Sequence, residues 1–143
     1  MSAAFGLPGA GVAGFRTSHE QAIHARRVAT LTGRQPGAVT NYGDVGLLAI
    51  ATGDVELARD FVARELGPLV RDDDDTRRLA ATLRVYLEEG SNARRAAQRL
   101  GVHENTIKNR IRNAEERLGH PASARIAETL LALRLAALVS RDS

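Results

Sequence analysis

Residues 92–118 read NARRAAQRLGVHENTIKNRIRNAEERL, and this stretch decides the fold of the chain. The pattern predicts a helix over 92–100, a sharp turn at Gly101 and a second helix over 104–118, with Val102 packed between the two helices at the turn. Apolar residues of the second helix lie within about 60° of one another, which predicts one buried stripe. The stripe is Ile107, Ile111, Ala114 and Leu118, and the first helix faces it with Ala96, Ala97 and Leu100.

The opposite face of the second helix carries side chains that suit nucleic acid. Asn can bond adenine through two hydrogen bonds, and Arg or Lys can bond guanine. Base selectivity is therefore predicted for Asn105, Lys108, Asn109 and Arg112, with Asn113 beside them. Contacts to the DNA backbone are predicted for Arg94, Arg95, Arg99, Thr106 and Arg110, and His103 is expected to cap the second helix or touch a phosphate.

Two other interpretations of this hairpin stay open. The first is an ordinary helical hairpin with solvated polar faces, and the second is a protein-interaction or dimerisation module. Residues 92–117 hold 7 basic and 3 acidic groups, and the exposed face is rich in Asn and Arg rather than in Glu–Lys pairs. These two details favour DNA as the partner.

The composition narrows the class of protein. The chain has 143 residues, which is about one domain, and its 3% aromatic content with no Trp favours packed helices. The absence of Cys excludes disulfides, thiolate metal sites and a cysteine nucleophile, and it is compatible with a cytoplasmic location. Residues 1–75 carry a net charge of −3 and residues 76–143 a net charge of +6, which indicates an anionic partner for the second half.

The remaining elements follow from local signals. Four Gly and one Pro between Gly6 and Gly14 predict a loop over 1–15, with a short strand near Ala3–Phe5. Asp72–Asp75 predicts an exposed linker in which Asp75 caps the next helix; a metal site is the alternative interpretation of these four acids. Other helices are predicted over 18–31, 45–51, 54–66, 76–88 and 123–139, and a strand over 38–42.

The run LAATLRVYLEEGSNARRAAQRLGVHENTIKNRIRNAEERLG, residues 79–119, resembles the C-terminal helix-turn-helix of the PucR/CdaR family of bacterial transcription regulators. The matching positions are Thr82–Leu83, Tyr86–Leu87, Asn92, Ala97, Leu100, His103, Asn105–Thr106, Arg110, Glu115 and Leu118–Gly119. Asn109 stands where the family often has an aromatic residue, and Ile126–Leu138 is similar to its closing apolar helix. The resemblance implies a DNA-binding transcription regulator whose recognition helix covers about 103–118.

The upstream segments also resemble this family. GVAGFRTSHEQAIHARRVA, VTNYGDVGLLAI and ARDFVARELGPL are similar to the last part of the degenerate GGDEF-like domain that precedes the helix-turn-helix. The resemblance implies two parts: 1–71 as the end of a GGDEF-like domain and 72–143 as the helix-turn-helix domain. The expected fold is mainly α, a four-helix domain preceded by a small, mostly helical remnant of an α/β domain. We expect either a fragment of a longer protein or a naturally short member.

Neither catalysis nor a cofactor is expected. The Gly-rich start lacks the GK[ST] ending of a phosphate-binding loop, and the GGDEF loop and metal-binding acids of a nucleotide cyclase are not present. His19 and His24 lie five residues apart, which is not the spacing of a helical metal pair, and His120 precedes Pro121 at a helix end. No metal site, no membrane span and no catalytic residue is therefore predicted.

The expected partners are double-stranded DNA and a second copy of the chain. Residues 1–70 supply at most one or two strands, so sheet edges would lie exposed beside the apolar side chains Val39, Leu47, Leu48 and Phe61. Such edges favour pairing with another chain, and a two-fold dimer suits paired DNA half-sites. The competing possibility is that this segment folds back on its own helices as a monomer.

Overall fold

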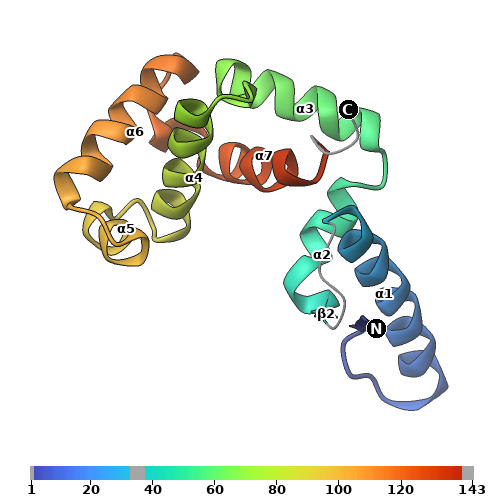
Figure 1. Cartoon of the computed structure of the whole chain (residues 1–143). Helices are drawn as coiled ribbons and strands as arrows, with labels where there is room; N and C mark the ends of the chain where they lie inside the picture. The colour runs from blue at the N-terminus through green and yellow to red at the C-terminus, as the bar shows by residue number, and fades with distance from the viewer. Residues whose placement is uncertain (1, 33–37, 140–143) are drawn as a thin grey trace. The chain divides into compact units, whose positions relative to one another are not determined.

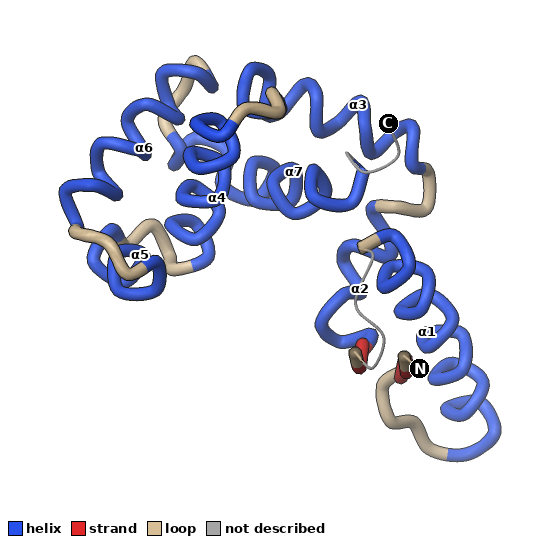
Figure 2. The backbone as a smooth tube through the Cα atoms, viewed as in Figure 1, coloured by secondary structure: helices blue, strands red, loops and turns tan. Residues whose placement is uncertain are grey.

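The computed structural model describes residues 2–32 and 38–139 (Figure 1, Figure 2). This part of the chain contains seven α-helices, two short 3₁₀ helices and two strands of three residues each. The prediction of a mainly α fold is therefore confirmed. In chain order the elements are β1 (Ala3–Phe5), α1 (Gly11–Leu31), β2 (Val39–Asn41), α2 (Tyr42–Ala51), α3 (Val55–Leu66), η1 (Gly67–Val70), α4 (Asp74–Glu88), α5 (Ala93–Leu100), α6 (Glu104–Leu118), η2 (Ala122–Arg125) and α7 (Ile126–Val139).

The chain divides into two compact units. The first consists of Met1–Ala58 together with Ala137–Ser143, and the second of Arg59–Ala136. The helix-turn-helix segment lies wholly in the second unit. The assignment of 1–71 to a GGDEF-like domain stays a prediction.

The first unit is built around two helices and a small parallel sheet. β1 pairs with β2 so that Ala3 lies opposite Val39. Its core joins Ala25 and Val28 of α1 to Val45 and Ala49 of α2. The guanidinium of Arg27 donates to the carbonyl oxygens of Ala49 and Thr52 at 2.6 and 2.7 Å, and so satisfies carbonyls at the end of α2 that have no partner within the helix.

The start of α1 differs from the sequence prediction. We predicted a loop as far as residue 15 and a helix from about 18, but α1 begins at Gly11. The glycines allow backbone segments to approach closely: a Cβ on Gly14 would lie 2.5 Å from the carbonyl carbon of Gly9. The prediction that these glycines prevent a helix is therefore wrong, because they let the preceding loop pack on the first turn. α2 also starts earlier than predicted, at Tyr42.

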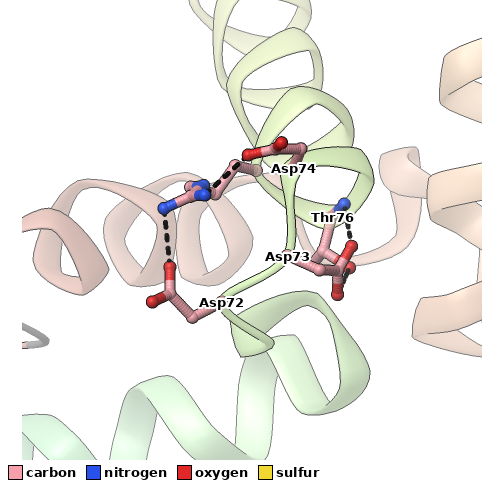
Figure 3. Close-up of polar contacts among 5 residues, drawn as sticks. Asp72, Asp73, Asp74 and Thr76 are labelled. Carbon is pink, nitrogen blue, oxygen red and sulfur yellow. Dashed lines mark hydrogen bonds and ion pairs between the residues drawn. The ribbon is translucent and has the colours of Figure 1, made fainter.

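The acidic run marks the start of α4 (Figure 3). Asp73 is the N-cap: its carboxylate accepts from the backbone N–H and the hydroxyl of Thr76, both at 2.8 Å. These two hydrogen bonds, the backbone one first, hold the pKa of Asp73 below its ordinary value of 3.8. The predicted cap at Asp75 is wrong. The helix begins inside the acidic run because carboxylates stabilise a helix N-terminus, so Asp75 lies in the first turn instead.

The core of the second unit lies where α4, α5 and α6 contact one another. Figure 1 shows α5 beside one end of α4 and of α6. Ile107, Ile111 and Ala114 are buried, so the predicted stripe on α6 is confirmed for these three, while Leu118 is half-buried. The two helices that contact α6 also contribute buried side chains: Leu79, Leu83, Leu87, Ala96 and Ala97.

The turn between α5 and α6 is fixed by Gly101. Its φ is +65°, in the left-handed region, and nothing lies within 4 Å of the place where a Cβ would stand. The N–H of Val102 donates to the carbonyl of Ala97 at 3.1 Å, which closes the end of α5 in a Schellman arrangement. In the turn between α4 and α5, Ser91 has a φ of 61°, which is unfavourable for a residue with a side chain.

These two turn positions give a paired prediction. Gly101→Ala should lower the free energy of unfolding by about 1–2 kcal/mol, because alanine is strained at this φ even though space is available. Ser91→Gly should change it in the other direction, by up to about 1 kcal/mol, because it relieves the same strain. Urea denaturation measures both, and equal effects of the two variants would contradict the conformational explanation.

The closing helix buries a polar group. Thr129 of α7 is completely buried, and its hydroxyl has no hydrogen-bond partner among the described residues. Thr82 of α4 is equally buried, but its hydroxyl donates to the carbonyl of Arg78 at 2.8 Å and accepts from Arg110. The two threonines therefore differ in hydrogen bonding and not in burial.

Replacing each threonine by valine should separate the contribution of hydrogen bonding to stability from that of burial. Thr129→Val should raise the free energy of unfolding by about 1 kcal/mol, because it removes an unsatisfied buried hydroxyl while keeping the shape. Thr82→Val should lower it by about 1 kcal/mol or more, because Arg110 loses a partner. Thermal or urea unfolding tests the pair, and stabilisation by both variants would show that the Thr82 hydrogen bonds contribute nothing.

Candidate nucleic-acid interface

The solvent-facing side of α6 carries four of the predicted DNA contacts. Asn105, Lys108, Asn109 and Arg112 are all exposed, and their spacing of three or four residues places them on one face. The buried stripe of Ile107, Ile111 and Ala114 holds the helix from the other side. The structure therefore brings these four side chains together on a single accessible surface, which we call the α6 polar face.

Two side-chain pairs organise the α6 polar face. Lys108 Nζ lies 2.8 Å from a carboxylate oxygen of Glu104, one helical turn earlier. Arg112 Nη2 donates to Asn109 Oδ1 at 2.9 Å. The hydrogen bond from Lys108, followed by its charge, holds the pKa of Glu104 below the usual carboxyl range. Each of the two pairs sets an acceptor oxygen against a cationic side chain.

The N-terminus of α6 is held by His103, whose Nδ1 accepts from the backbone N–H of Asn105 at 3.2 Å. The expectation that His103 caps the helix is confirmed. Glu104 places a carboxylate in the first turn, beside the positive end of the helix dipole. The backbone N–H groups of a helix N-terminus can also bind an anionic group such as a phosphate.

The first helix of the motif adds basic side chains. Asn92 caps α5 by accepting from the backbone N–H of Arg95 at 3.0 Å. Arg94 and Arg95 follow in the first turn, and both side chains are exposed. Arg99, by contrast, lies 2.8 Å from a carboxylate oxygen of Glu88 and 3.2 Å from one of Glu89. Arg99 therefore forms ion pairs with the last residue of α4 and with the C-cap of that helix.

Arg110 and Thr106 stand apart from the exposed predicted contacts. Arg110 is half-buried, and its Nη1 donates to the hydroxyl of Thr82 on α4 at 3.3 Å. Thr106 is also half-buried, at the edge of the α6 polar face. The structure places Arg110 where it joins α6 to α4. A role for it at a DNA phosphate stays a prediction.

Several polar side chains that brace the domain were missed by sequence reasoning. Arg117 donates to the hydroxyl of Thr76 at 2.7 Å and pairs with Asp75, which joins the end of α6 to the start of α4. Glu115 accepts from the backbone N–H of Ala122 at 2.8 Å and so caps η2. Arg117 and Thr76 lie 41 residues apart in the sequence, and Glu115 and Ala122 lie 7 apart. The presence of Glu115 in the family motif was the one sequence feature that could have indicated either contact.

The acidic run and the apolar helices were the candidates for a metal site and a membrane span in the described part of the chain. It contains no group of three or more His, Asp or Glu residues that is placed to hold a metal ion. The acids of the run 72–75 are engaged instead with Thr76, Arg77 and Arg117. None of the described helices has the length and apolarity needed to cross a membrane.

Comparison with known proteins agrees with the helix-turn-helix geometry. Residues 79–139 match the family of the PucR C-terminal helix-turn-helix domain, so this segment is similar to that domain. The chain is also similar to the proline-responsive transcriptional activator PutR of Bacillus subtilis (strain 168), at 26% identity over 103 residues. That alignment covers 69% of this chain but 25% of PutR. The family match thus agrees with the helix-turn-helix geometry, and this chain spans about a quarter of the length of the transcriptional activator to which it is similar.

Proposed function

We propose that this chain is a bacterial DNA-binding transcription regulator, acting in the cytoplasm, whose helix α6 enters the major groove. The observation that carries the proposal is the α6 polar face, an exposed Asn, Lys and Arg surface. It lies opposite the buried stripe of a PucR-type helix-turn-helix. In such motifs the second helix reads base edges from the groove while the first crosses the backbone. The proposed function involves no catalytic step.

The proposed roles follow exposure and partners. Asn105, Lys108, Asn109 and Arg112 would contact base edges, since they are exposed on one face. Arg94 and Arg95, at the start of α5, would contact phosphates on either side of the groove. Thr106 would contact the backbone at the edge of the α6 polar face. His103 and Arg110 would chiefly hold α6 in place, through the cap and through Thr82.

Salt dependence tests the proposed function. With about five phosphate contacts, the logarithm of the association constant should fall with the logarithm of salt concentration at a slope of about −4 to −5. Selection of bound sequences from random DNA, followed by fluorescence anisotropy at several salt concentrations, measures both sequence and slope. Failure to bind any DNA at low salt would overturn the proposal.

Two arginines of α5 provide a matched comparison. Arg94→Ala should weaken binding to all sequences alike and reduce the magnitude of the salt slope by about 1, because one phosphate contact is lost. Arg99→Ala removes the same charge from the same helix, but that guanidinium is already paired with Glu88 and Glu89. It should leave the slope nearly unchanged. Equal effects of the two variants would show that charge alone, and not position, determines binding.

We further propose that the chain binds DNA as a homodimer that associates through its first unit. Large apolar side chains are exposed there, among them Val12, Phe15 and Ile50, each at least 74% exposed. The two-stranded sheet of that unit also presents backbone groups at its edges. A two-fold dimer would place two copies of α6 on paired half-sites.

Sedimentation equilibrium of the full chain tests the dimer. A dimer is expected at tens of micromolar, and Phe15→Glu should shift it toward monomer by placing charge in the interface. The control is Ile126→Glu, which adds the same charge at a 43% exposed apolar position of the second unit. This control should leave the association constant unchanged. A wild-type chain that stays monomeric at these concentrations would contradict the proposal.

A further inference from the structure

Two carboxylates hold Arg99 through one of its three nitrogens. Its Nη1 lies 2.8 Å from Oε2 of Glu88 and 3.2 Å from Oε1 of Glu89. Within the described part of the chain, its Nε and Nη2 have no hydrogen-bond partner, and the side chain is 47% exposed. All three nitrogens of a guanidinium carry donors. Arg99 therefore keeps donors that a phosphate could use.

The two carboxylates differ in their other contacts. The second oxygen of Glu88 lies 3.6 Å from Arg134 Nη2 on α7 and 3.8 Å from Arg84 Nε on α4. Glu88 thus joins α4, α5 and α7. Glu89 is the C-cap of α4, and among the cations that the structure describes its side chain pairs with Arg99. Glu88 is shared by several arginines, whereas the charge of Glu89 acts mainly on Arg99.

Arg99 lies near a proposed phosphate contact. It follows Arg95 by four residues, so the two side chains share a face of α5. Helical side chains lean toward the N-terminus of their helix, so Arg99 extends toward the turn that carries Arg95. The first helix of a helix-turn-helix crosses the DNA backbone. A phosphate bound by Arg95 would therefore lie within reach of Arg99.

The charge of Glu89 opposes that second contact. A carboxylate and a phosphate bind a guanidinium through the same kind of charge-assisted hydrogen bond, so they compete for Arg99. Three guanidiniums and two carboxylates meet in this cluster, which gives it a net charge of +1. Neutralising Glu89 would raise this net charge to +2 and leave Glu88 to hold the three arginines.

We propose that Glu89 neutralises Arg99 and so keeps it from binding a DNA phosphate, which limits the affinity of the chain for DNA. This inference rests on the proposed function, since it assumes that the DNA backbone crosses α5. Phosphate contacts carry no sequence information. Removing the charge of Glu89 should therefore strengthen binding to the operator and to unrelated DNA alike.

Glu89→Gln is the test variant because it removes the charge and keeps the shape and an acceptor for Arg99. The magnitude of the salt slope should increase by about 1, because one phosphate contact is gained, and binding at low salt should tighten several-fold. Glu89→Ala, which also removes the acceptor, should act in the same direction. In an Arg99→Ala background, Glu89→Gln should leave the slope unchanged.

The matched control is Glu65→Gln. Glu65 lies 2.8 Å from Arg125, whose side chain is 47% exposed, as that of Arg99 is. Neither residue belongs to α5 or α6, so this variant should keep the wild-type slope. Fluorescence anisotropy of the full chain, with a selected duplex and one of scrambled sequence, gives the slope for each variant. Circular dichroism checks that helical content is retained.

The outcomes separate this inference from the proposed function. If the wild type binds no duplex at low salt, the proposed function fails and this inference fails with it. If the wild type binds DNA but both Glu89 variants keep its slope, the role of Glu89 alone is overturned. An equal gain with and without Arg99 would also overturn it, since Glu89 would then repel DNA by charge alone. A gain of the same size from Glu65→Gln would overturn it for the same reason.

Discussion

The burial of Ile107 is the constraint on which the second unit depends. This side chain is completely enclosed, and Ile111 and Ala114 continue the same stripe along α6. Burial of such side chains fixes the rotation of the helix about its axis, because turning it would expose apolar surface and bury charge. The rotation in turn determines which residues face solvent, so the α6 polar face is a consequence of the core behind it.

Polar residues complete what the apolar stripe begins. Asn92 and His103 cap the N-termini of α5 and α6, and the Glu115 carboxylate accepts a hydrogen bond from the first residue of η2. Arg110 joins the middle of α6 to α4, and Arg117 joins its end to the start of α4. Several residues of a motif that resembles a DNA-binding pattern therefore hold α6 against the rest of the unit. An Arg at a motif position is not by itself evidence of a phosphate contact.

Sequence reasoning predicted most of the second unit because its signals are local. The turn at Gly101, the stripe on α6 and the cap at His103 all depend on residues a few positions apart. It failed where a distant contact decides the outcome. From the sequence, Gly14 is interpreted as a helix breaker. In the structure it allows the preceding loop to fold back so that Gly9 lies close to the helix, and the sequence does not indicate this contact. The bond of Arg110 to Thr82 spans 28 residues, and periodicity gives no indication of it.

The distribution of ion pairs changes how the basic charge of the second half should be understood. Several of its arginines are paired with acids inside the unit: Arg77, Arg84, Arg99, Arg117, Arg125 and Arg134. A paired arginine contributes little to the field felt by an approaching anion, because its partner cancels most of its charge within a Debye length. The net charge of +6 over residues 76–143 therefore produces positive potential mainly at exposed arginines, such as Arg94 and Arg95 at the start of α5. Charge counted along the sequence indicates an anionic partner, but the ion pairs decide which surface it approaches.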